Sequence, residues 1–227
     1  YEDLPRNLIN AFVAAEDREF YSHFGINPFA IVRAMAKNLI AGRVVQGGST
    51  ITQQLAKRLF TSGERTLARK AMEAVLALQI EKRFSKEEIL EMYFNQIYLG
   101  HGCYGVSSAA RLFFNKDVRQ LDVAESSVLA ALPSAPGRHS PLMNTREAYV
   151  KNRDTLTRMV DAGYLSEERA DRIYQEFWPV FVDSIKTEFT TKNAFSRNED
   201  RAPYFTDYVR QILTARFGKE AVYSDGM

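Results

Sequence analysis

Apolar residues recur at three- and four-residue spacing through most of this 227-residue chain, and this periodicity limits its fold more than any other feature. With prolines and glycines at its interruptions, the pattern predicts helices over residues 5–22, 28–41, about 50–60, 64–83, 86–98, 106–114, 122–131 and 146–160, and a short one from Ser166. Before residue 180, no run alternates apolar and polar residues as a half-buried strand does. We therefore expect a mainly α domain.

The character of the sequence changes near residue 180. Residues 187–201 are polar and lack periodicity, which is typical of a linker, and 202–217 predict one more short helix. We therefore assign residues 1–180 to one domain and 181–227 to a linker. The sequence begins with Tyr1 and has no signal peptide, so we expect a fragment of a longer chain.

Charge and composition exclude some classes of protein. The 30 basic and 28 acidic residues leave a net charge of +2, which is too balanced to favour a nucleic-acid partner. Hydrophobic residues make up 45% of the chain, enough for a sizeable core, and a single cysteine, Cys103, excludes an intrachain disulfide. No window reaches the ~18 apolar residues of a membrane span, so we expect either a soluble protein or an anchor outside this sequence.

An acidic cluster, EDREFYSH, ends the first predicted helix. Helical spacing would place Glu16, Glu19, Phe20 and His23 on one face. Five apolar residues precede Glu16, so its carboxylate should be partly desolvated and its pKa raised, as suits a general base. The alternative is a solvated acidic pair beside Arg18, and composition alone favours that alternative.

A second motif, QGGSTITQQLAK, places two glycines before a predicted helix. Such a helix start offers backbone N–H groups and a favourable dipole to anions. Hydroxyl, amide and ammonium groups would share one face of this helix, which suits a sugar or a phosphate; they belong to Thr50, Gln53, Gln54 and Lys57. An ordinary capped amphipathic helix is the alternative, and the Gly-Lys-Ser/Thr ending of a P-loop is missing.

A third motif, RKAMEAVLAL, contains one carboxylate in an apolar helix. A helix that is apolar all round is usually buried, and a buried Glu73 would need a partner. Arg69 and Lys70 lie one turn earlier, within reach of it. A structural ion pair and a carboxylate beside two phosphate-binding cations are equally open interpretations.

Two further segments look structural. The helix ILEMYFN and the glycine loop after it, residues 100–105, predict a helix–loop corner, in which Glu91 and Asn95 could orient the loop. His101 and Cys103 are too few for a metal site. The segment LPSAP, residues 132–136, predicts a rigid exit from a helix.

Taken together, these segments resemble family 51 glycosyltransferases, the glycan-polymerising domains of class A penicillin-binding proteins. The resemblance covers about residues 2–165, and five motifs occur in the family's order: EDREFYSHFG, GGSTITQQLAK, RKAMEAVLALQIEKRF, ILEMYFNQIYLGHGCYGVSSAA and ALPSAPGRHSP. Arg58 departs from the family's usual Asn, and Phe94 stands where Leu is frequent. The resemblance implies a lysozyme-like large lobe and a smaller, membrane-associated lobe.

The resemblance also implies site residues. Glu16 would be the general base and Glu73 the second essential acid. The substrate-binding residues it implies are Asp17, Phe20, His23, Gly48, Ser49, Thr50, Gln53, Gln54, Lys57, Arg69 and Lys70. The reaction would polymerise lipid II into β-1,4-linked strands with inversion and release undecaprenyl diphosphate. No organic cofactor is implied; a divalent cation, Mg²⁺ or Mn²⁺, would assist diphosphate departure, at a metal site that the sequence leaves unknown.

Further implications of the resemblance concern partners and place. The partners would be lipid II, the lipid-linked glycan chain, the membrane surface and phosphoglycolipid inhibitors such as moenomycin, with no nucleic acid. A transpeptidase domain would follow in the same chain, but its Ser-x-x-Lys motif is absent from this sequence. The enzyme would work at the outer face of the bacterial cytoplasmic membrane. Apolar residues with interleaved cations over 26–45 predict an interfacial helix, with about half of the apolar side chains packed in the core.

Three other classes stay open on the sequence. A lysozyme-like glycan-cleaving enzyme would share the fold type but would not need the cations near residues 57 and 69–70. A membrane-associated assembly module would not need intact Glu16 and Glu73. A nucleic-acid binder would show salt-dependent binding.

Overall fold

Helices form almost all the regular structure in the computed structural model, which describes residues 4–43, 47–60 and 66–185. The α-helices are α1 (Arg6–Glu16), α2 (Pro28–Ala41), α3 (Ile51–Phe60), α4 (Leu67–Arg83), α5 (Lys86–Gln96), α6 (Val106–Phe114), α7 (Val123–Ala131), α8 (Thr145–Asp161) and α9 (Glu167–Arg172). Short helical turns are η1 (Phe20–Ser22), η2 (Val118–Gln120) and the π-helical η3 (Ile173–Phe177). Within the described ranges, β-structure is limited to one isolated bridge between Tyr98 and Tyr104. The mainly α prediction is confirmed.

Most helix ends follow from local sequence. Asn27 accepts the Ala30 N–H at the start of α2, and Gly42, with a φ of +61°, ends that helix in the left-handed region. Ser85 and Glu88 form a capping box at α5. The first predicted helix was wrong in extent, because α1 ends at Glu16 and the chain turns at Asp17, whose φ is −156°. Residues 16, 19, 20 and 23 therefore do not share one helical face.

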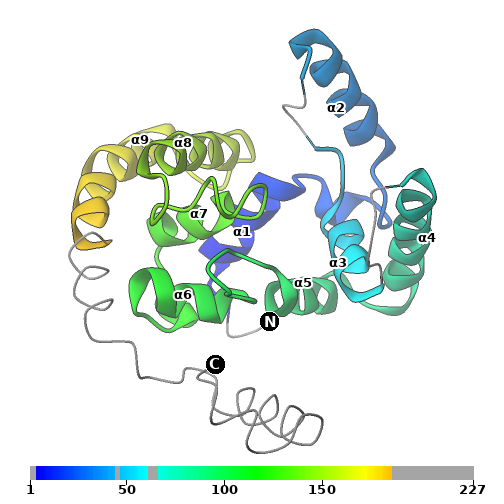
Figure 1. Ribbon diagram of the computed structural model, residues 1–227, viewed down its shortest axis with the longest axis horizontal. Helices are drawn as coiled ribbons and strands as arrows, with labels where there is room; N and C mark the ends of the chain where they lie inside the picture. The colour runs from blue at the N-terminus through cyan, green and yellow to red at the C-terminus, as the bar shows by residue number, and fades with distance from the viewer. Residues whose placement is uncertain (1–3, 44–46, 61–65, 186–227) are drawn as a thin grey trace, which may run out of the picture. The chain divides into compact units, whose positions relative to one another are not determined.

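The core lies around α1. This helix packs against α7 and α8, while α3 packs against α4 and α5 (Figure 1). Phe12 contacts Phe94 edge-to-face, with 5.1 Å between ring centroids, and also meets the ring of Tyr93 on α5. The apolar face of α1 thus holds its last residue, Glu16, at a fixed place beside α3, α5 and α8.

Helix α4 does not follow the predicted burial. It buries Glu73, Ala77 and Ile80 but leaves four large apolar side chains exposed, namely Leu67, Met72, Val75 and Leu78. The expectation that an apolar helix here would be buried all round is wrong, because packing of α4 on α3 and α5 leaves these four side chains exposed.

Helix α2 is exposed along most of its length and extends away from the other helices (Figure 1). Only Ala34 is buried on it. Six apolar side chains that the sequence would divide between core and surface are all exposed: Phe29, Ile31, Val32, Met35, Leu39 and Ile40. Among the described residues, no helix combines the length and apolar character needed to cross a membrane.

A second apolar cluster holds the C-terminal helical segment. Trp178, Phe181 and Ile185 pack with Val128 and Ala148. The folded unit extends to Ile185. The predicted linker beyond it and the predicted helix over 202–217 lie outside the described residues.

Candidate active site

One large cleft of about 1600 Å³ runs between two groups of helices. Its walls come from the end of α1, from α2, α3 and α4, and from α8 with residues 133–139 before it. Both predicted carboxylates, Glu16 and Glu73, line it. The cleft therefore brings together the first, second and third motifs, which are distant in sequence.

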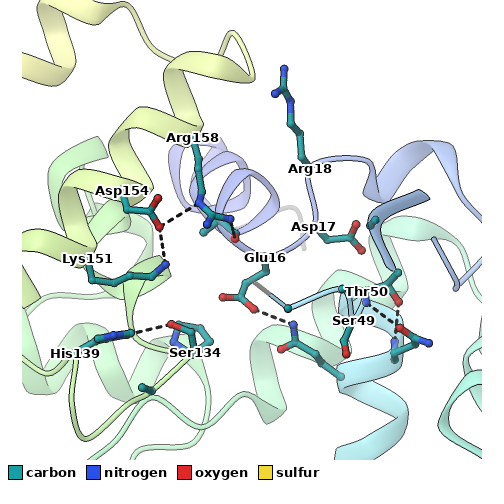
Figure 2. Close-up of a pocket in the computed structure, with 18 of the residues that line it drawn as sticks. Glu16, Asp17, Arg18, Ser49, Thr50, Ser134, His139, Lys151, Asp154 and Arg158 are labelled. Carbon is teal, nitrogen blue, oxygen red and sulfur yellow. Dashed lines mark hydrogen bonds and ion pairs between the residues drawn. The ribbon is translucent and has the colours of Figure 1, made fainter. Parts of the chain in front are cut away.

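Glu16 is the half-buried carboxylate at the C-terminal end of α1 (Figure 2). Gln54 on α3 donates its amide N–H to Glu16 Oε2 at 2.8 Å, and the Tyr93 hydroxyl donates to Gln54 Oε1 at 3.3 Å. Burial raises the pKa of Glu16, while the Gln54 hydrogen bond and the charges of Lys151 and Arg158 act against that rise. A carboxylate with a raised pKa and a face on the cleft can accept a proton.

Asp17 organises the turn behind Glu16. Its Oδ2 accepts the His23 ring N–H at 2.9 Å and the backbone N–H of Ile51 at 2.9 Å. Asp17 also lines the cleft, but His23 and the fully buried Phe20 are not among its lining side chains. The structure thus places two of the implied substrate-binding residues in the packing behind the cleft, where His23 holds Asp17 and Asp17 in turn holds the start of α3.

The glycine motif before α3 is a packed turn as well as a cleft wall. A Cβ on Gly48 would come within 2.9 Å of Ile31 Cα, so this close approach to α2 requires glycine. The Thr50 hydroxyl donates to Gly25 O at 2.6 Å, and the Thr50 N–H donates to Gln53 Oε1 at 3.0 Å. Thr50 and Gln53 are buried, so their hydrogen bonds hold the turn, whereas Lys57 on the same helix is exposed to the cleft.

Glu73 is 1% exposed and lies between two cations. Lys70 Nζ donates to Glu73 Oε2 at 2.9 Å, and Arg69 Nε lies 3.4 Å from Oε1. The same Lys70 ammonium donates to the Ser49 hydroxyl at 2.9 Å, which joins α4 to the glycine motif. The third motif therefore builds a cationic group around one carboxylate, facing Glu16's cleft.

The wall formed by α8 and residues 133–139 was missed. Ser134 and His139 hydrogen-bond each other at 3.0 Å, and both line the cleft (Figure 2). The segment LPSAP, predicted to be a rigid exit from a helix, thus also contributes to the cleft wall. On α8, Lys151, Asp154 and Arg158 also face the cleft. Their spacing of three and four residues places them on one helix face, a signal that could have been found in the sequence. The glycine loop, in contrast, is a packed corner, since a Cβ on Gly105 would come within 3.0 Å of Asn95 O.

The side chains of this cleft do not fit a resident metal ion. Across the described ranges, no group of three or more His, Cys, Asp or Glu side chains could hold one. Glu73 is instead paired with two cations, which would repel a metal. A divalent cation, Mg²⁺ or Mn²⁺, that assists diphosphate departure stays a prediction.

Comparison with known proteins places the chain in a family. A model of the transglycosylase family matches residues 1–160, so the chain belongs to the transglycosylase family. It is 46% identical to penicillin-binding protein 1A of Aquifex aeolicus over 97% of this chain and 28% of that protein. It is 42% identical to penicillin-binding protein 1A of Escherichia coli over 99% of this chain and 25% of that protein. The family resemblance seen in the motifs is confirmed.

A solved structure gives a weaker likeness. The match to the crystal structure of penicillin-binding protein 1A from Haemophilus influenzae covers 98% of this chain and 21% of the other chain, with 26% identity and a TM-score of 0.49. The chain spans about a quarter of the length of the curated relatives it matches.

Proposed function

We propose that this chain is a peptidoglycan glycosyltransferase domain that polymerises lipid II into β-1,4-linked glycan strands. One observation carries the proposal: a half-buried carboxylate with a raised pKa, Glu16, shares a cleft with a carboxylate held between two cations, Glu73. The first suits removal of a proton from a sugar hydroxyl. The cations around the second suit a leaving diphosphate.

In the proposed reaction, Glu16 takes the proton from the 4-hydroxyl of the acceptor disaccharide. The freed oxygen pair attacks the anomeric carbon of the donor chain, and the bond from that carbon to the diphosphate oxygen breaks. Undecaprenyl diphosphate leaves with the bonding electrons, and Lys70, Arg69 and Lys57 balance its charge. Attack opposite the leaving group inverts the anomeric carbon, so no covalent glycosyl-enzyme forms.

The cations distinguish this proposal from a glycan-cleaving enzyme. A hydrolase acting on polymeric glycan has no diphosphate to release, so it gains nothing from Arg69 and Lys70 beside the second carboxylate. The retained carboxylates also speak against an assembly module without catalysis. Incubation with polymeric peptidoglycan separates these functions, because release of fragments would favour the hydrolase.

The exposed apolar faces of α2 and α4 support an interfacial position. The substrate's lipid tail stays in the bilayer, because each methylene moved into water costs about 0.8 kcal/mol. The active site must therefore approach the membrane, and α2 and α4 both border the cleft. We assign this work to the outer face of the bacterial cytoplasmic membrane, in a longer chain that carries a transpeptidase domain.

The test is polymerisation of purified lipid II by the wild-type chain and by Glu16→Gln, with and without chelator. Glycan strands should form with the wild-type chain only. Activity that disappears on chelation and returns with Mg²⁺ or Mn²⁺ would support the predicted cation. A folded wild-type chain that makes no glycan from lipid II in detergent or liposomes would contradict the proposal.

A further inference from the structure

Three charged side chains of α8 form a small network on the cleft wall beside Glu16. Lys151 Nζ donates to Asp154 Oδ2 at 2.7 Å, and Arg158 Nε donates to the same oxygen at 3.1 Å. Arg158 also donates through NH1 to the backbone carbonyl of Ala15 at 3.1 Å. Asp154 thus binds both Lys151 and Arg158, and Arg158 also hydrogen-bonds the backbone of the residue that precedes Glu16.

The direction of these side chains matters. In Figure 2, Lys151 points toward Glu16 from one side, and Arg158 lies above it from α8. Asp154 keeps both cations on α8 by hydrogen bonds, and neither forms an ion pair with Glu16, whose Oε2 accepts from Gln54 instead. Although burial acts to raise it, the hydrogen bond and charge of Lys151 hold the pKa of Asp154 below its usual value. Asp154 is therefore an anion at neutral pH.

We propose that Asp154 is a positioning residue that holds Lys151 and Arg158 near Glu16 while preventing either from pairing with it. This rests on the proposed function, in which Glu16 is the general base. A base must be free to accept a proton, and a carboxylate in a direct ion pair is a weaker base. Two cations kept at a distance instead limit how far burial alone can raise its pKa.

Other groups facing Glu16 come from three elements. Asp17 follows it in the chain, Tyr93 faces it from α5, and Gln54 touches it from α3. Asp17 raises the pKa of Glu16 and is itself held by His23 and Ile51. The hydrogen bonds of Gln54 and Asp17 involve no residue of α8, so we expect substitutions on α8 to leave them in place and to isolate the effect of the network.

The experiment measures the pKa of Glu16 directly, by carbon NMR of its carboxyl group in the full chain, with assignment by Glu16→Gln. Asp154→Asn leaves both cations uncompensated, so the pKa should fall by about one unit. Lys151→Gln removes one cation, so the pKa should rise. The double variant should return toward the wild-type value, and Asp154→Glu should preserve it.

A matched control lies on the same helix. Glu147→Gln also removes one negative charge from α8 and frees a cation of the cleft, Arg138, with which Glu147 is paired at 2.9 Å. It should leave the pKa of Glu16 unchanged. With lipid II as substrate, the acidic limb of the kcat/KM profile should move in the same directions as the NMR values, and Asp154→Asn should also lower the plateau.

Opposite shifts for Asp154→Asn and Lys151→Gln support the network, since loss of structure alone would not move one pKa in two directions. Equal pKa values in all variants, or shifts of the same sign, would overturn it. If Asp154→Asn does not fold, Lys151→Gln and Asp154→Glu decide. The NMR titration needs no turnover. A wild-type chain that does not polymerise lipid II would therefore contradict the proposed function, while the pKa shifts of Glu16 could still be measured.

Discussion

Helices α1 and α4 each bring one carboxylate to the same cleft, but they bury opposite kinds of residue. Helix α1 buries its apolar side chains, among them Leu8 and Phe12, and ends in the half-buried Glu16. Helix α4 buries Glu73 and exposes apolar side chains, with Leu67 at 90% exposure. Burial raises the pKa of Glu16, whereas Glu73 is paired with two cations, Arg69 and Lys70. In the proposed function, that difference would give proton transfer to Glu16 and charge balance to Glu73.

The largest effect should come from the α1 carboxylate. Glu16→Gln keeps the shape and the contact with Gln54 but cannot accept a proton. Loss of a general base typically costs about 10²–10⁴-fold in rate. Turnover of lipid II, measured beside the thermal midpoint, checks this, and a folded Gln variant with near-normal turnover would show that Glu16 is not the base.

The α4 carboxylate should behave differently. Glu73→Gln should reduce turnover by about 10²-fold, because the cations lose the anion that positions them. It should still bind a diphosphate-bearing or phosphoglycolipid inhibitor, since Arg69 and Lys70 become free for phosphate. Binding is measured by calorimetry on the folded variant. Complete loss of inhibitor binding would make Glu73 a scaffold residue and remove the contrast with Glu16.

How far the sequence predicts this contrast depends on the element. Helix bounds followed from capping residues and glycines, as at Asn27 and Gly42, and family motifs led to both carboxylates. The end of α1 was missed because the break at Asp17 depends on contacts with His23 and Ile51, which are tertiary. The exposure of α4 was missed because an apolar pattern does not tell whether protein or lipid covers it. The α8 wall was visible as a 3–4 spacing, but nothing local showed which way it faced.

A smaller effect should come from α3. Lys57 is exposed to the cleft, one turn after Gln53, and Lys57→Ala should weaken donor binding and slow turnover by about tenfold, the cost of one hydrogen bond to a charged group. The comparison variant is Arg58→Ala, at the neighbouring residue, whose guanidinium donates to Gln96 O at 3.4 Å. Unchanged affinity of Lys57→Ala for a phosphoglycolipid that resembles the donor would place the diphosphate elsewhere in the cleft.

The smallest effect on chemistry, and the sharpest test of the α1–α4 contrast, should come from the exposed apolar faces. We expect the chain to bind detergent micelles or anionic liposomes without any further anchor, and replacing Phe29 and Met35 on α2 with Ser should weaken that binding.

On α4, Val75→Ser with Leu78→Ser should weaken it as well. The four replaced side chains, two on α2 and two on α4, are 40–81% exposed. Their replacement should therefore leave the thermal midpoint almost unchanged, unlike truncation of a core residue. Val180→Ser is the matched control, because Val180 is 70% exposed but belongs to the C-terminal helical segment. Liposome sedimentation gives the readout, and turnover in detergent should persist in every variant. If the wild-type chain stays in the supernatant with and without lipid II, a membrane does not cover the exposed apolar face of α4. A protein partner would then be the expected cover of that face.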